Sequence, residues 1–158
     1  MITLTRRYRF SASHRLQSPH LSDAENARIY GKCNNPFGHG HDYRLEVTAA
    51  GEIDEVTGQL LPLAALDRLV EEQILPRFAF RNINLDVPQL SERVPTTENL
   101  ALVIADLLEE HWRAYLDGTG ARLYRVHIQE TDRNGFELLI ARASRPVVAE
   151  EESVKSYA

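Results

Sequence analysis

The stretch that decides the fold is residues 39–51, which read HGHDYRLEVTAAG. Apolar and polar side chains alternate from Tyr43 to Ala49, and this period of two residues is typical of a half-buried β-strand. The strand begins with a His-x-His pair, and the same alternation directs His39 and His41 to one face of it. Two imidazoles on one face at a strand end indicate a metal site with room for a ligand.

A third histidine, His14, ends the earlier alternating stretch 3–13, which we also expect to be a strand. Three neutral imidazoles leave a zinc ion its full charge and an open fourth position, the arrangement of catalytic zinc. The only cysteine, Cys33, stands beside Lys32 in a polar run of Gly, Asn and Pro, and a neighbouring cation favours the reactive thiolate. The alternative, that His14 is an ordinary surface or core residue, stays open at this point.

Length and composition set the class of protein. A chain of 158 residues with 43% hydrophobic and 26% charged residues predicts one globular domain. A net charge of −5 argues against a nucleic-acid or membrane partner, and no apolar stretch is long enough to cross a bilayer. One cysteine excludes an intramolecular disulfide, and residues 1–7 lack the apolar centre of a signal peptide. We therefore expect a cytoplasmic protein.

The remaining periodic segments predict two helices and a hairpin. After the first two strands we expect a short strand at 59–61 and then a helix that starts at Pro62 and carries an apolar stripe from Leu63 to Ile74. A second helix is expected at about 98–116, capped by Thr96 or Thr97, followed by strands at 124–130 and 136–140 joined by a type I′ turn at Asn134-Gly135. Segments 15–38 and 76–95 are expected to be irregular. This order predicts an α+β fold, a four-stranded antiparallel sheet with two helices on one face. Its open edges favour closure into an oligomeric ring.

The chain resembles the 6-pyruvoyl-tetrahydropterin synthase family. The motifs that carry the resemblance, in the family's order, are FSASHRL at 10–16, GKCNNPFGHGHDY at 31–43, PTTEN at 95–99 and ETD at 130–132. The resemblance covers residues 1 to about 142 and implies the tunnelling fold. It divides the chain into a pterin synthase-like domain at 1–145 and a C-terminal tail at 146–158, which we expect to be flexible.

The resemblance also implies an assembly and a substrate. The family forms homohexamers, dimers of trimers built from oligomeric barrels, with active sites at subunit interfaces. Its substrate is 7,8-dihydroneopterin triphosphate, from which triphosphate is eliminated. By the match, His14, His39 and His41 would bind Zn²⁺, Cys33 would be the general base, and Glu130 would anchor the pterin ring.

Other expected substrate contacts have simpler alternatives. Thr96, Thr97 and Glu98 would lie near the pterin, although plain helix capping explains the same residues. Glu130 shares its strand parity with Val126 and Ile128, so the carboxylate continues an apolar row. The alternative for Glu130 is a strand residue that faces solvent.

The chain departs from the family at one pair of residues. The family's Asp-His relay, in a segment that reads Leu-Asp-His-Lys-Asn-Leu, falls here on Ala79 and Phe80 if Asn82 and residues 85–88 fix the register. Neither replacement can carry a proton. His20, in the long connection that also holds Cys33, is the one local histidine we would test as a substitute.

Three functions are compatible with this pattern. The first is a zinc-dependent lyase that makes 6-pyruvoyl-tetrahydropterin or a related pterin without the usual relay. The second is a 6-carboxy-tetrahydropterin synthase of queuosine biosynthesis, although that group usually has a shorter cysteine-to-histidine spacer than the one at 33–41. The third is a catalytically impaired pterin-binding protein, or a subunit that completes a mixed hexamer with a paralogue.

Overall fold

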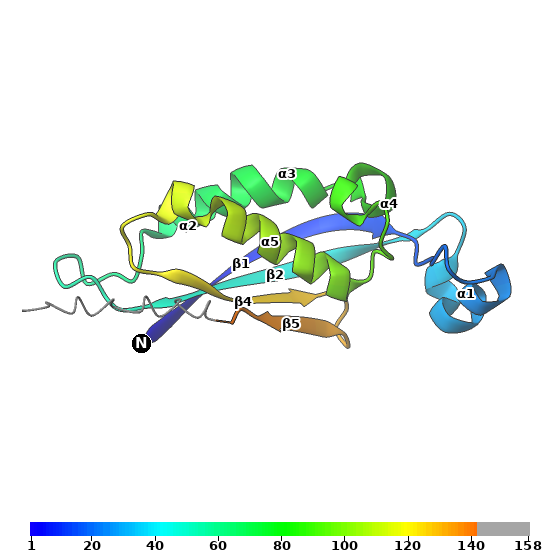
Figure 1. Cartoon of the computed structure of the whole chain (residues 1–158), viewed down its shortest axis with the longest axis horizontal. Helices are drawn as coiled ribbons and strands as arrows, with labels where there is room; N and C mark the ends of the chain where they lie inside the picture. The colour runs from blue at the N-terminus through cyan, green and yellow to red at the C-terminus, as the bar shows by residue number, and fades with distance from the viewer. Residues whose placement is uncertain (142–158) are drawn as a thin grey trace, which may run out of the picture.

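Two long strands form the centre of the structure, a computed structural model in which residues 1–141 are described (Figure 1). Strand β1 (Ile2–His14) and strand β2 (His39–Gly51) run antiparallel in unbroken register, from Ile2 opposite Gly51 to His14 opposite His39. The strands predicted from alternation are therefore confirmed. Their pairing brings two of the predicted metal ligands to adjacent positions at one end of the sheet.

The sheet has five strands in the order β3-β1-β2-β4-β5. Strands β4 (Arg122–Gln129) and β5 (Gly135–Leu139) extend it antiparallel on the β2 side. The short β3 (Arg81–Asn82) pairs parallel with β1 on the other side, so the expected count of four strands is corrected to five. A two-residue strand carries no periodic pattern, which explains why sequence reasoning treated this segment as irregular.

Two helical rods cover one face of the sheet, as the sequence predicted (Figure 1). The first consists of α2 (Leu63–Leu69), a π-helical turn η2 (Val70–Ile74) and α3 (Leu75–Phe78). The second is α5 (Thr97–Leu116). The core between rods and sheet is apolar and includes, as fully buried members, Tyr43, Leu45, Leu66, Leu69, Ile74, Phe78, Leu100, Ile104, Leu108 and Ile128.

Helix starts follow the sequence signals only in part. Thr96 is the N-cap of α5 and its hydroxyl accepts a hydrogen bond from the amide of Asn99, as one of the two predicted caps. Pro62 is the N-cap of α2 instead of its first residue, and residues 59–61 form no strand.

The hairpin between β4 and β5 differs from the predicted type I′ turn. Residues 130–134 form the connection, closed by the amide of Glu130 donating to the carbonyl of Asn134. Gly135 lies in β5 opposite Gln129 and has no positive φ. A Cβ at Gly135 would lie 2.8 Å from Nε2 of His127, so the glycine is explained by packing across the strands instead of by a turn.

The connection between β1 and β2 contains structure that alternation did not reveal. Helix α1 (Asp23–Tyr30) starts with a capping box, in which Ser22 and Glu25 each satisfy the other's backbone amide. A 3₁₀ turn η1 (Gly31–Asn34) follows and holds Cys33. Segment 76–95 likewise contains α4 (Ile83–Asp86) and the 3₁₀ turn η3 (Pro88–Leu90).

The uncovered face of the sheet is polar. Arg125 forms ion pairs with both Glu46 and Glu137, and Arg7 pairs with Glu46. Among residues 1–141, no helix is long and apolar enough to cross a membrane. The predicted tail at 146–158, and residues 142–145 of the predicted domain, lie outside the described part of the chain.

Gly38 fixes the approach of the connection to the end of the sheet that carries His14 and His39. Its φ is +70°, and a Cβ there would lie 2.9 Å from the backbone oxygen of His14. Gly58 has the same φ but no atom within 4 Å of an added Cβ. We expect Gly38→Ala to lower the free energy of unfolding by about 2–4 kcal/mol, and Gly58→Ala by about 1 kcal/mol, the cost of the left-handed backbone alone. Urea unfolding of both variants measures this, and equal losses would contradict the close contact at Gly38.

Candidate metal and ligand site

Three imidazoles converge at the end of the β1–β2 pair. His14 comes from the last position of β1, and His39 and His41 come from the start of β2. One ring nitrogen from each lies within 4.8 Å of the other two, and Nε2 of His14 is 3.1 Å from Nε2 of His39. A tetrahedral metal with bonds of about 2.0–2.1 Å to nitrogen separates its ligand atoms by about 3.3 Å, so the cluster has the spacing of a metal site.

A backbone contact orients His14. The ring is 1% exposed, and its Nδ1 is 2.8 Å from the carbonyl oxygen of Pro95. A carbonyl can only accept, so Nδ1 carries the proton and Nε2 faces the other two imidazoles with its lone pair. Burial is the main cause that lowers the pKa of His14, followed in the same direction by the charge of His39. The neutral imidazole that a metal requires is therefore the favoured form.

Two ring nitrogens of the cluster lack protein partners. Nδ1 of His39 and Nε2 of His41 are buried without a hydrogen bond to any residue of the described part of the chain. Burial also lowers the pKa of His39, with the charge of His41 as the next cause. Buried imidazole nitrogens without partners, together with the 4.8 Å grouping, fit a bound cation better than an apolar core. The predicted ligands can therefore hold a metal.

A carboxylate lies directly beside the three imidazoles. Oε1 of Glu130, immediately after β4, is 3.7 Å from Nε2 of both His14 and His41. The hydroxyl of Thr97, buried in the first turn of α5, donates to the same oxygen at 2.7 Å. The solvent-facing alternative for Glu130 is thereby excluded, because its side chain points to the covered face of the sheet.

The cysteine turn is tied to the end of β1. The carbonyl of Cys33 accepts from the amide of Leu16, and the side chain of Asn34 donates to the carbonyl of Leu16. Arg15 donates from its Nε to the carbonyl of Asn34. These bonds hold the half-buried thiol near the residues that follow His14.

The other predicted site residues are placed differently. Thr96 serves as the cap of α5, and Glu98 is exposed. His20 is exposed in the connection after β1, and its backbone amide donates a hydrogen bond to the hydroxyl of Ser18. Neither Glu98 nor His20 belongs to the cluster of potential metal ligands.

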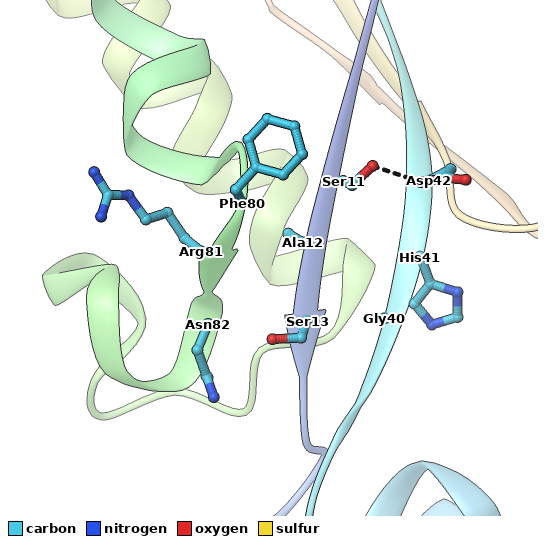
Figure 2. A pocket seen from close by; sticks show the side chains of 9 residues that line it. All are labelled: Ser11, Ala12, Ser13, Gly40, His41, Asp42, Phe80, Arg81 and Asn82. Carbon is cyan, nitrogen blue, oxygen red and sulfur yellow. Dashed lines mark hydrogen bonds between the residues drawn. The ribbon is translucent and has the colours of Figure 1, made fainter.

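Ala79 and Phe80 directly follow α3, and Phe80 lines a cavity of about 480 Å³ between β3 and the ends of β1 and β2 (Figure 2). Phe80 has a φ of 60° and is 90% exposed, and its amide donates to the carbonyl of Ser11. The cavity is lined by polar groups, among them Ser11, Asp42 and Asn82. A bulky residue in the left-handed region is uncommon and marks this position as one under local constraint.

Sequence reasoning missed one residue of the site. Tyr43 lies on β2 next in parity to His41, with ring centroids 5.5 Å apart, and stacks on Phe10 at 5.0 Å. Its side chain is fully buried, and its hydroxyl has no hydrogen-bond partner within residues 1–141. The alternation of the strand already places Tyr43 on the same face as His39 and His41. A tyrosine in an apolar row is, however, usually interpreted as a core residue.

Comparison with known proteins identifies the family to which this chain is similar. The family model described as 6-pyruvoyl tetrahydropterin synthase matches residues 3–139. The 6-pyruvoyl tetrahydrobiopterin synthases of Poecilia reticulata and Homo sapiens are 47% and 46% identical over 131 residues, which is 83% of this chain and 85% and 86% of theirs. The chain belongs to this family. Family membership and these relatives support a function as a pterin synthase-like lyase.

A solved structure agrees in fold. The 6-pyruvoyl tetrahydropterin synthase of Caenorhabditis elegans superposes with a TM-score of 0.80 at 37% sequence identity, covering 89% of this chain and 96% of that one. The resemblance drawn from four short motifs is thereby confirmed for the family and for its fold.

Proposed function

We propose that the protein is a zinc-dependent lyase that eliminates triphosphate from 7,8-dihydroneopterin triphosphate, giving 6-pyruvoyl-tetrahydropterin or a related pterin. The observation that carries the proposal is the Glu130 carboxylate 3.7 Å from two imidazoles of a three-histidine cluster. A metal ion would bind the hydroxylated side chain of such a substrate, and the neighbouring carboxylate would bind its ring. Neither group alone would have that specificity.

His14, His39 and His41 would hold the zinc ion. A bound zinc ion lowers the pKa of hydroxyl groups that it contacts and stabilises negative charge on oxygen. The Pro95 carbonyl keeps His14 in the tautomer that offers Nε2, and the half-exposed rim of His39 and His41 leaves access from one side.

Glu130 would anchor the pterin ring. An ionised carboxylate accepts two hydrogen bonds from the adjacent N–H and amino groups of the guanidine-like ring edge. Thr97 fixes the orientation of Glu130 by donating to Oε1, which leaves Oε2 and a second lone pair on Oε1 for the ligand. Thr96 then acts indirectly, because its cap of α5 sets the position of Thr97. Glu98 would lie at the outer edge of the ring.

Cys33 would be the general base. As a thiolate it removes a proton from a side-chain carbon of the substrate, triphosphate leaves with the bonding electrons, and tautomerisation transfers oxidation state from side chain to ring. The conversion needs no external redox cofactor, because electrons move only within the substrate.

The metal content of the protein tests the proposed ligands. We expect about one zinc per chain in the purified protein, and loss of that zinc in His39→Ala, His41→Ala double variants, because a single remaining imidazole cannot hold a catalytic site. His111→Ala, which changes a half-buried histidine of α5 outside the cluster, is the matched control and should retain zinc. Metal analysis by mass spectrometry decides the point, and full zinc occupancy in the double variant would show that the ligands are wrongly assigned.

A homohexamer is part of the proposal. The outer edge of β1 before Ala12 faces no strand among residues 1–141, and the outer edge of β5 is also open. Open strand edges of this length favour pairing with neighbouring copies. Large exposed side chains at the metal-ligand end of the fold, Phe37, Phe80 and Leu85, would be covered by such neighbours.

Sedimentation velocity at micromolar concentration should therefore show a hexamer, with a trimer as the dissociation product. Replacing an edge residue of β5 by proline, as in Glu137→Pro, should release smaller species because it removes a backbone donor and fixes φ. A parent that sediments as a monomer would remove the assembly from the proposal together with any site shared between subunits.

The second function that an observation favours is a pterin-binding subunit with impaired catalysis. Ala79 and Phe80, the positions matched to the family's Asp-His relay, carry no titratable group. We expect the parent to bind pterin through Glu130 and to eliminate triphosphate slowly at neutral pH. Ala79→Asp with Phe80→His should raise the rate about a hundredfold or more with little change in affinity, since a relay acts in the transition state.

Product formation, followed by mass spectrometry, and pterin affinity are measured for the parent, the relay variant and a control variant. The control is Ala79→Asn with Phe80→Asn, which adds polar groups without a proton carrier. Asn also tolerates the left-handed backbone at position 80. A parent with rapid turnover and an inactive Cys33→Ala variant would show that the relay is dispensable. Equal activity of Cys33→Ala and parent would remove the cysteine from the mechanism.

A further inference from the structure

The face of the sheet that the helices leave uncovered carries two positive charges directly opposite each other (Figure 1). Arg9 of β1 pairs in register with Arg44 of β2, and both side chains are exposed. They alternate with the buried Phe10 and Tyr43, which point to the helices, so both arginines point to the uncovered face. Like charges directly opposite each other destabilise an antiparallel strand pair. This arginine pair therefore lowers the stability of the free protein unless a negative group lies between the two guanidinium groups.

The charged residues next to the arginine pair already have partners. Glu46, two residues along β2, accepts hydrogen bonds from Arg7 at 2.8 Å and from Arg125 at 2.7 Å. Asp42, two residues along β2 in the other direction, accepts from the hydroxyl of Ser11. Within residues 1–141, neither guanidinium group of the arginine pair forms a salt bridge or a side-chain hydrogen bond. Two positive charges thus remain unmatched on this part of the sheet.

The arginine pair lines a cavity of about 520 Å³ on the uncovered face. Gln129 of β4 lies opposite Arg44 and lines the same cavity, while Gly135 on the far side of Gln129 adds no side chain. Glu46 is the one carboxylate among the described residues of this lining, and its two arginine partners offset its charge. The cavity therefore offers an anion two free guanidinium groups and an amide donor.

A second cavity, of about 400 Å³, borders the same arginine pair but has the opposite charge balance. Its lining includes Asp42, Glu130 and Asp132. An anion in that cavity would meet three carboxylates beside the two guanidinium groups, and like charges at short range repel. The charge balance therefore favours the cavity of about 520 Å³ as the place for an anion.

We propose that Arg9, Arg44 and Gln129 bind a phosphate-class dianion, either free phosphate or a phosphate group of a polyphosphate, in the cavity of about 520 Å³. The two guanidinium groups match the charge of the dianion and donate in planar forks that fit its oxygens, and the amide adds a neutral donor. Facing side chains on paired strands start about 4.5–5.5 Å apart, so one anion can contact both arginines. The three histidines point to the helix-covered face, so this inference does not depend on the proposed function.

The test uses the full chain at constant ionic strength, with orthophosphate and inorganic triphosphate as probes and chloride as the reference anion. Arg9→Gln, Arg44→Gln and the double variant remove positive charge and keep polar side chains. Arg28→Gln, which changes an exposed arginine of α1 outside this cavity, is the charge-matched control. Calorimetric titration gives the affinity for each probe, and thermal unfolding in chloride gives the stability of each protein.

We expect each single variant to bind the probes about tenfold more weakly than the parent, and the double variant to lose this binding. Arg28→Gln should bind like the parent. In chloride alone, Arg9→Gln and Arg44→Gln should melt at the temperature of the parent or above it, because repulsion between the facing guanidinium groups is removed.

The two probes distinguish the sources of the anion. Triphosphate that binds at least tenfold more tightly than orthophosphate would identify a polyphosphate, such as the leaving group of the proposed reaction, as the ligand. Equal affinities would identify a single phosphate group as the unit that the arginine pair recognises.

Three results overturn the proposed anion site. One is a parent that binds neither probe. Another is equal affinity of the parent and the double variant, which would place the anion elsewhere, for example on a metal held by the histidines. The third is a lower melting temperature of both single variants in chloride, which would show that the arginines have a stabilising partner in the assembled protein. The elimination reaction is assayed separately, so its failure leaves the anion site standing.

Discussion

The unbroken register of β1 against β2 is the constraint on which the rest of the structure depends. It sets His14 opposite His39 and Ala12 opposite His41, so all three imidazoles face the helix-covered side at one end of the sheet. A slip of one residue would turn one set of histidines to the polar face, because side chains alternate. The register is fixed by the buried row that runs through Tyr43, Leu45 and Val47 under the helices. The same strand register is therefore required both for packing of the core and for bringing the three histidines together.

Helix α5 connects that sheet to the ligand site through one hydrogen bond. Thr97 lies in the first turn of α5 and donates to Glu130 at the end of β4. Pro95, the residue before the N-cap of α5, supplies the carbonyl that orients His14. The N-terminal end of one helix thus positions both the carboxylate and one candidate metal ligand. The sequence predicts α5 from its apolar stripe and its cap. It does not predict that the start of this helix orients Glu130 and His14.

Local patterns predicted the elements that have a strong period and left out those without one. The two long strands, α5 with Thr96 as one of two predicted caps, and the His39–His41 pair on one face followed from alternation and spacing. The addition of His14 to that pair also drew on the family resemblance. Helix α1 was missed although its capping box was legible in Ser22 and Glu25. Strand β3 could not be predicted, since two residues carry no period. Asn134-Gly135 misled because the glycine serves close packing against His127, a contact between strands that a dipeptide cannot encode.

The connection spanning residues 15–38 starts and ends next to two facing histidines, His14 and His39. Closing a loop costs entropy that grows only with the logarithm of its length, about 0.6 kcal/mol for each doubling. A cation held by His14 and His39 would join the two ends and restrict the unfolded chain in the way a cross-link does. A change in the length of this connection would thus alter the entropy of loop closure by only a small amount. What fixes the position of Cys33 is the set of hydrogen bonds that join its turn to Arg15 and Leu16.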